Sequence, residues 1–147
     1  MSSDQGFSSY LIAPVAAWLT AQLLKFLLNM QSQKGRRWRL LYQSGNMPSA
    51  HTATLVALMT VIGVRDGTAS GLFALSFVVT AIAAYDALMV RRSGGEQGLA
   101  LRKLLEISPF HKDPMPYQAL GHRPLEVAVG ALIGVSLGMI VAIFITI

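Results

Sequence analysis

Residues 69–90 read ASGLFALSFVVTAIAAYDALMV, an apolar run in which Asp86 is the only charged side chain. A helix rises ~1.5 Å per residue, so about 20 mostly apolar residues are needed to cross a hydrocarbon core of ~30 Å. The run therefore predicts a helix that spans a membrane.

Three other stretches of similar length and character occur at residues 8–30, 47–64 and 124–147. Of the 147 residues, 53% are apolar and only 13% are charged, a balance that excludes an ordinary soluble domain. Cysteine is absent, which excludes disulfide bonds and thiolate metal ligands. We expect an all-α integral membrane protein whose single transmembrane domain, residues 1–147, is a compact antiparallel bundle of about four helices.

Positive charge is concentrated in two of the three connections between these stretches. The first connection carries Lys34, Arg36, Arg37 and Arg39, and the third carries Arg91, Arg92, Arg102, Lys103, Lys112 and Arg123. The positive-inside rule places both connections, including the long loop 93–123, in the cytoplasm and both termini on the opposite side. Basic residues beside a membrane most often meet anionic lipid headgroups, so we expect membrane lipids as partners and no nucleic acid.

The long loop contains an amphipathic segment after the flexible sequence Ser93-Gly94-Gly95. Its apolar side chains are Leu99, Leu101, Leu104, Leu105 and Ile107, and its charged ones are Arg102, Lys103 and Glu106. Their spacing predicts a short helix that lies in the membrane interface.

Two of the predicted helices carry signals at particular positions. Asn46 is a good N-cap for the second helix, with Pro48 in the first turn, where a missing N–H costs nothing. Gly130, Gly134 and Gly138 recur at every fourth position of the last helix, which favours a face that packs closely against a neighbour.

Asp86 lies about a turn and a half inside the cytoplasmic end of its predicted helix. A lone carboxylate at that depth costs several kcal/mol unless it is paired or hydrated. Three roles remain open for it: a direct role in a site, an ion pair with Lys25, or an ion pair with Arg91.

Two histidines lie in the first turns of predicted helices, His51 in the segment Met-Pro-Ser-Ala-His and His122 in Gly-His-Arg-Pro-Leu-Glu. A helix N-terminus offers unpaired N–H groups and the positive end of the peptide dipole, which together favour an anion. Either histidine alone is most simply a polar residue near a helix start. In an antiparallel bundle, however, the same cytoplasmic ends also gather Gln22, Lys25, Ser49, Asp86, Arg91, Arg92, Arg123 and Glu126. The combination predicts a phosphate site.

His122 and Glu126 are four residues apart and so share a helix face, where the carboxylate can bind one imidazole nitrogen. The other nitrogen then keeps a free lone pair, the arrangement of a nucleophilic histidine that is oriented by a third group. The surrounding cations make phosphorus the favoured electrophile, and His51 can protonate the departing alkoxide.

The segments Met47-Pro48-Ser49-Ala50-His51 and Gly121-His122-Arg123-Pro124-Leu125-Glu126 resemble the divergent branch of the type-2 phosphatidic acid phosphatase superfamily, which is related to vanadium-dependent haloperoxidases. The resemblance covers nearly the whole chain. It implies that His122 forms a phosphohistidine, that Glu126 orients it and that His51 is the acid. It implies phosphate contacts from Lys25, Ser49, the Ala50 amide and Arg91 or Arg92; we add Arg123 as a neighbouring cation and Asp86 and Gln22 as supporting residues. The arginine stands before the long loop, instead of shortly before the nucleophile as in the superfamily.

The residues and the resemblance together predict a phosphatase or phosphotransferase, without metal or cofactor, that acts on a lipid phosphate or diphosphate at the cytoplasmic face. Two other interpretations use the same residues. One is a non-catalytic scaffold that binds anionic lipids. The other is a small transporter component, suggested by Asp86 and the glycines of the last helix, which would form a pathway only as a homo-oligomer. His111 and Asp113 are too few to indicate a metal site.

Overall fold

The structure is a computed structural model that describes residues 3–29, 47–108 and 121–145. The elements follow in the order α1 (Ser3–Asn29), α2 (Ala50–Arg65), α3 (Gly71–Tyr85), the π turn η2 (Asp86–Val90), α4 (Arg91–Glu106) and α5 (Pro124–Phe144). All regular structure in these ranges is helical, so the expected all-α fold is confirmed. The basic first connection and the pair His111 and Asp113 lie outside the described residues.

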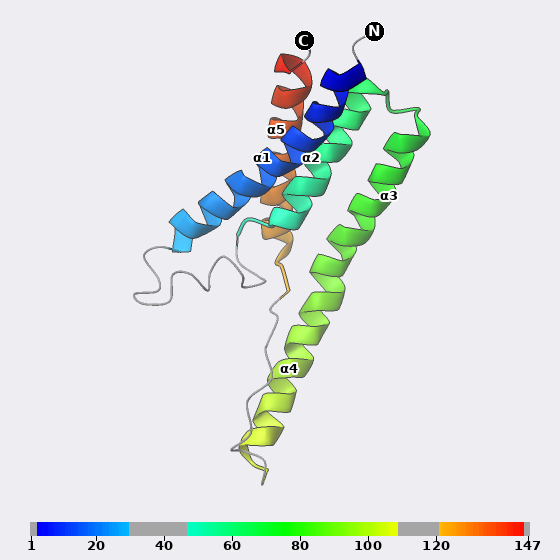
Figure 1. Cartoon of the computed structure of the whole chain (residues 1–147). Helices are drawn as coiled ribbons and strands as arrows, with labels where there is room; N and C mark the ends of the chain where they lie inside the picture. The colour runs from blue at the N-terminus through cyan, green and yellow to red at the C-terminus, as the bar shows by residue number, and fades with distance from the viewer. Residues whose placement is uncertain (1–2, 30–46, 109–120, 146–147) are drawn as a thin grey trace.

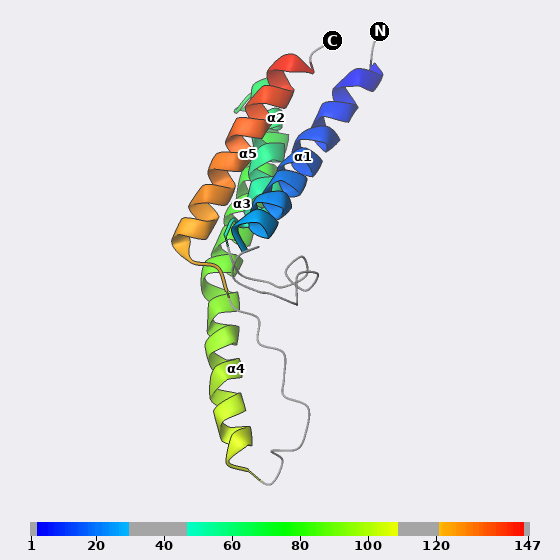
Figure 2. The same cartoon turned by 90° about the vertical axis from the view of Figure 1, so that its left-hand side faces the viewer.

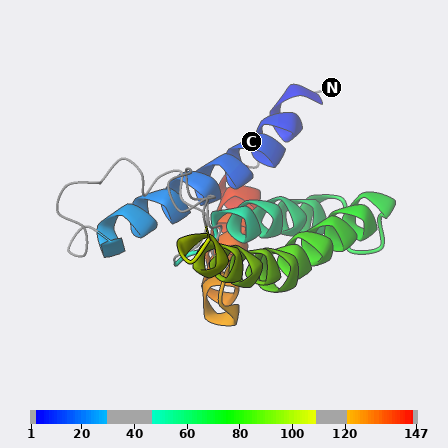
Figure 3. The ribbon, with the colours of Figure 1, turned by 90° about the horizontal axis from the view of Figure 1, so that it is seen from below.

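The helices form an antiparallel bundle in which both chain ends emerge on the same side (Figure 1). Helix α2 contacts α1, α3 and α5. Seen along the bundle in Figure 3, α2 lies between α1 on one side and α3 on the other. The N-terminal ends of α2 and α5 therefore lie at the end of the bundle opposite the chain termini.

Three helical stretches in the described part of the chain are long and apolar enough to cross a membrane: Ser9–Leu28, Gly71–Glu106 and Pro124–Phe144. Helix α2 is also apolar but has only 16 residues, which at ~1.5 Å per residue amounts to about 24 Å. The chain is thus a multi-pass membrane protein, in which the shorter helix is surrounded by the longer ones.

The third helix does not end at residue 90 as the sequence predicts. Helices α3, η2 and α4 form one continuous helix of 36 residues, and Ser93, Gly94 and Gly95 lie within it. The segment expected to lie in the membrane interface therefore continues the axis of α3 and projects beyond the other helices (Figure 2). Extending an existing helix avoids the cost of nucleation, and this offsets the ~1 kcal/mol by which each glycine disfavours a helix.

Helix α2 also begins later than expected. Its N-cap is Ser49, whose Oγ accepts the N–H of Thr52, and Pro48 precedes the helix instead of lying in its first turn. The expected cap, Asn46, lies outside the described residues. His51 nevertheless remains in the first turn of α2.

The closest helix contact joins α2 and α5 through the three glycines of α5. A Cβ at Gly130 would lie 2.5 Å from the carbonyl oxygen of Ser49, and one at Gly134 would lie 2.6 Å from that of Ala53. A Cβ at Gly138 would lie 2.7 Å from Cβ of Thr60. These glycines therefore let the two backbones touch, as their spacing predicts.

Polar bonds join three helices at the end of the bundle that carries the chain termini. The hydroxyl of Tyr10 on α1 donates to both carboxylate oxygens of Asp66 at the end of α2, at 2.8 and 2.7 Å. The guanidinium of Arg65 donates through Nη2 to the carbonyl oxygen of Ile145, at 3.2 Å. These bonds fix α1, α2 and α5 at the end away from the histidines.

Candidate functional site

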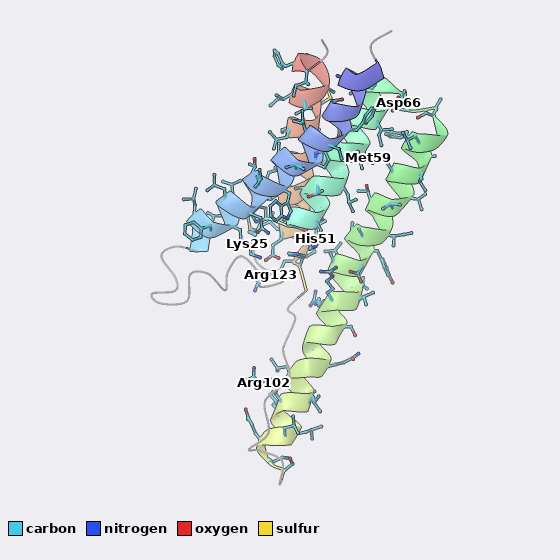
Figure 4. The ribbon with its side chains drawn as sticks, viewed as in Figure 1. Lys25, His51, Met59, Asp66, Arg102 and Arg123 are labelled. Carbon is cyan, nitrogen blue, oxygen red and sulfur yellow. The ribbon has the colours of Figure 1, made fainter. Side chains whose placement is uncertain are left out.

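At the other end of the bundle, five side chains lie within electrostatic or hydrogen-bonding range of one another: Lys25, His51, Arg91, His122 and Glu126. We call this group the histidine site. His122 lies in the segment just before α5, and not in the first turn of that helix where the sequence predicts it, because α5 begins only after its N-cap Arg123. Figure 4 shows Lys25, His51 and Arg123 close to where α1, α2 and α5 approach one another. Arg91, His122, Lys25 and Asp86 all act electrostatically on the imidazole of His51, and Glu126 acts on the ammonium of Lys25. Residues far apart in the sequence are thus within electrostatic range of one another.

His122 and Glu126 form a largely buried pair within the site. Nδ1 of His122 lies 2.9 Å from Oε2 of Glu126, and the two side chains are only 6% and 13% exposed. The same carboxylate oxygen accepts the main-chain N–H of Arg123, the N-cap of α5, at 3.2 Å. A carboxylate held in this way favours the proton on Nδ1 and leaves Nε2 with its lone pair. Among the described residues, Nε2 has no hydrogen-bond partner.

The main chain of His122 is bound to the π turn. Its N–H donates to the carbonyl oxygen of Ala87 at 3.1 Å. In a regular α-helix that carbonyl would accept the N–H of Arg91, but in the π turn the Arg91 N–H bonds to Asp86 instead. The Ala87 carbonyl is thereby available to hold the segment that carries His122.

Gly121 explains how the arginines come close to His122 despite the long connection. A Cβ at Gly121 would lie 2.4 Å from the main-chain nitrogen of Arg92, so the backbone there packs directly on the start of α4. Neither Gly121 nor Ala87 is predicted from the sequence to be a residue that builds the site. A glycine immediately before His122 is the one signal that could have indicated the close contact.

Ser49, for which the resemblance implies a phosphate contact, has structural contacts in α2 and α5. Its hydroxyl is fully buried, accepts the N–H of Thr52 at 3.5 Å and lies 3.0 Å from the hydroxyl of Thr52. Its main-chain N–H donates to the carbonyl oxygen of Glu126 at 3.0 Å. Ser49 therefore caps α2 and joins it to α5, while Ala50 begins the helix.

The cations differ in how the structure holds them. Lys25 is only 7% exposed, and its ammonium group interacts electrostatically with the carboxylate of Glu126. Nε of Arg91 donates to Oδ2 of Asp86 at 2.7 Å, which shows that Arg91 is the ion-pair partner of Asp86. Arg92 bonds to Glu96 at 3.3 Å with both side chains exposed to solvent.

Two more of the expected residues lie at the edge of the site. Arg123 is exposed and serves as the N-cap of α5. Gln22 lies on α1 nearly one turn before Lys25, and its Oε1 is buried without a hydrogen-bond partner among the described residues. Within those ranges, no three His, Asp or Glu residues are grouped so that they could hold a metal ion.

The fold defines a small multi-pass helical membrane protein. The two histidines of the site lie at the N-terminal ends of α2 and α5, the two helices that pack together through the glycines of α5. The model of the Divergent PAP2 family matches residues 7–137, and the chain belongs to this family. The resemblance seen in the sequence is thus confirmed. The chain is also 32% identical to the "Uncharacterized membrane protein YuiD" of Bacillus subtilis (strain 168), over 91% of this chain and 94% of that protein. No solved structure matches it.

Proposed function

We propose that the protein is a phosphatase or phosphotransferase that uses neither metal nor cofactor, and that it acts on a lipid phosphate or diphosphate through a phosphohistidine. The observation that carries the proposal is the buried pair of His122 and Glu126, in which the carboxylate holds Nδ1. Membership of the Divergent PAP2 family supports a phosphatase-related role.

The proposed reaction has two steps with balanced proton transfers. Nε2 of His122 attacks phosphorus, the bond to the leaving oxygen breaks, and protonated His51 gives its proton to the departing alkoxide. Water, or an alcohol in a phosphotransferase, then attacks the phosphohistidine and passes its proton to His51. Lys25 and Arg91 neutralise the charge on the nonbridging oxygens in both steps.

A lipid substrate is supported by the surroundings of Lys25. The ammonium group is buried, yet Leu24 and Leu28 on the same helix are 37% and 62% exposed. In a membrane such leucines face lipid, so an anion beside Lys25 would lie at the boundary where lipid headgroups lie. The positive-inside rule assigns this end of the bundle to the cytoplasm.

Phosphate release by the purified protein tests the proposal. Protein reconstituted in lipid vesicles should release phosphate from lysophosphatidate, phosphatidate or a polyprenyl diphosphate in the presence of a chelator, and orthovanadate should inhibit the release. His122→Ala should abolish it, and Lys25→Ala should raise KM. If wild type and His122→Ala are equally inactive on every substrate, the proposed function is wrong.

Trapping of the intermediate separates an enzyme from a scaffold or a transporter. Radiolabel on His122 that is labile in acid and stable in base would support the enzyme. Stoichiometric lipid binding that survives His122→Gln, without any turnover, would instead support a lipid-binding scaffold. Ion flux abolished by Asp86→Asn, again without turnover, would support a transporter component.

A further inference from the structure

The π turn η2 lies beside the histidine site, and the proposed reaction by itself gives it no role. The Arg91 N–H bonds five residues back to Asp86, where a regular α-helix would bond four residues back. Single π turns inside α-helices are rare and occur frequently at functional sites.

The wider turn changes which side chains are neighbours. In an α-helix, side chains three or four residues apart lie on the same face, whereas those five apart diverge. Asp86 and Arg91 are five apart and lie on either side of the π turn, yet Nε of Arg91 bonds to Oδ2 of Asp86 at 2.7 Å. The π turn therefore makes this ion pair geometrically accessible.

The bond to Asp86 uses only Nε of the Arg91 guanidinium group. Arginine presents five N–H donors in a rigid planar fork, and two parallel bonds from such a fork suit a phosphate. With Nε held, the two terminal nitrogens of Arg91 remain, and neither has a hydrogen-bond partner in the described part of the chain. The charge of Arg91 acts on His51, so the guanidinium is within electrostatic range of the histidine site.

We propose that Asp86 is a positioning residue that holds Nε of Arg91 across the π turn and so aims the two terminal nitrogens at the phosphoryl group bound between His51 and His122. The proposal rests on the proposed function, because it takes phosphate to be the ligand of the histidine site. The same turn holds the nucleophile, since the Ala87 carbonyl accepts the N–H of His122. The π turn thus fixes the positions of both Arg91 and His122.

A neighbouring ion pair supplies the matched control. Arg92 and Glu96 are four apart in regular helix, are 66% and 71% exposed and lie 3.3 Å apart. Exposed pairs of this kind contribute little to stability. Glu96→Ala removes a carboxylate from an arginine in the same helix without disturbing the π turn.

Binding of orthovanadate, a phosphate analogue, to the purified full chain in detergent tests the proposal by calorimetry. Arg91→Ala should weaken binding by about tenfold or more, as expected for a lost hydrogen-bonded charge. Asp86→Ala should weaken it several-fold, and the double variant should bind no more weakly than Arg91→Ala. Asp86→Asn should stay within about twofold of wild type, because its amide oxygen can still accept from Nε. Glu96→Ala should bind as wild type does.

Asp86→Glu guards against the case in which Asp86→Ala does not fold. It keeps the charge but moves the carboxylate by one methylene, so we expect weaker binding with an unchanged melting temperature. Wild-type affinity in both Asp86→Ala and Asp86→Glu would overturn the proposal. The proposal would also be overturned if the double variant lost affinity by the product of the two single losses. Absence of vanadate binding by the wild type would overturn it as well. A protein that shows the expected pattern but hydrolyses no lipid would refute the proposed function and leave the role of Asp86 standing.

Discussion

The main-chain N–H of Ser49 donates to the main-chain carbonyl oxygen of Glu126 at 3.0 Å. Ser49 stands two residues before His51, and Glu126 stands four residues after His122. The segments that carry the two histidines are therefore joined by backbone atoms, whose positions do not depend on a side-chain rotamer. A site built in this way suits chemistry that needs two groups at a fixed separation.

Glu126→Gln should lower kcat by about tenfold to 100-fold while KM changes little, because the amide no longer stabilises the protonated state or the orientation of His122. Steady-state kinetics on the best lipid substrate measure both constants. The matched control is Glu96→Ala, which removes an exposed carboxylate and should leave both constants unchanged. An increase in KM with an unaltered kcat would assign Glu126 to substrate binding instead.

Gly134→Ala should destabilise the bundle, because its Cβ would lie 2.6 Å from the Ala53 carbonyl oxygen and 2.8 Å from Cβ of Val56. Overpacking of this kind costs about 1 to 3 kcal/mol. Thermal unfolding in detergent should show a lower midpoint. Gly94→Ala is the control: nothing lies within 4 Å of its Cβ, and alanine favours a helix, so its midpoint should stay the same or rise. Equal midpoints for Gly134→Ala and wild type would contradict the close packing.

Gly121→Ala should reduce turnover more than it reduces stability. Its Cβ would lie 2.4 Å from the Arg92 nitrogen, so the chain must move away from α4 and weaken the bond between the His122 N–H and Ala87. We expect kcat to fall by about tenfold, in line with the cost of a misplaced reacting group. Gly71→Ala, where a Cβ has open space, should retain full activity. Wild-type turnover in Gly121→Ala would show that this contact does not position His122 for the proposed reaction.

The membrane orientation can be tested with single cysteines, because the chain contains none of its own. Ala69→Cys lies in the exposed turn between α2 and α3, and Gln97→Cys lies on an exposed position of α4. The positive-inside rule predicts that a membrane-impermeant maleimide labels Ala69→Cys in intact cells and labels Gln97→Cys only after permeabilisation. The reverse pattern would place the histidine site on the outer face.

The sequence predicted the helices well where the signal was an apolar run or a regular spacing. The apolar helix of the run at 69–90, apart from its end, and the glycines of α5 appear as expected, because each depends on a face that the 3.6-residue period defines. The predicted pairing of His122 with Glu126 is also present, although His122 lies just before α5 and not in its first turn. The long helix through Gly94 and Gly95 was not predicted, since glycine usually indicates a break.

The residues that complete the site depend on contacts between segments far apart in the chain. The π turn has no recognisable sequence pattern, so the bond from His122 to Ala87 and the pairing of Asp86 with Arg91 could not be singled out beforehand. Ser49 was expected at the phosphate because of a motif, whereas its buried hydroxyl caps α2. A motif identifies which residue is present, and only the packing around it decides which atoms remain exposed to a ligand.

The backbone contact between α2 and α5 also bears on permeation. Where Gly134 meets Ala53 there is no space for even one methyl group, so a hydrated ion cannot slip between these two helices. The contact between α2 and α5 is closed along the three glycines of α5. Any path for an ion through the bundle would therefore have to run elsewhere than between α2 and α5.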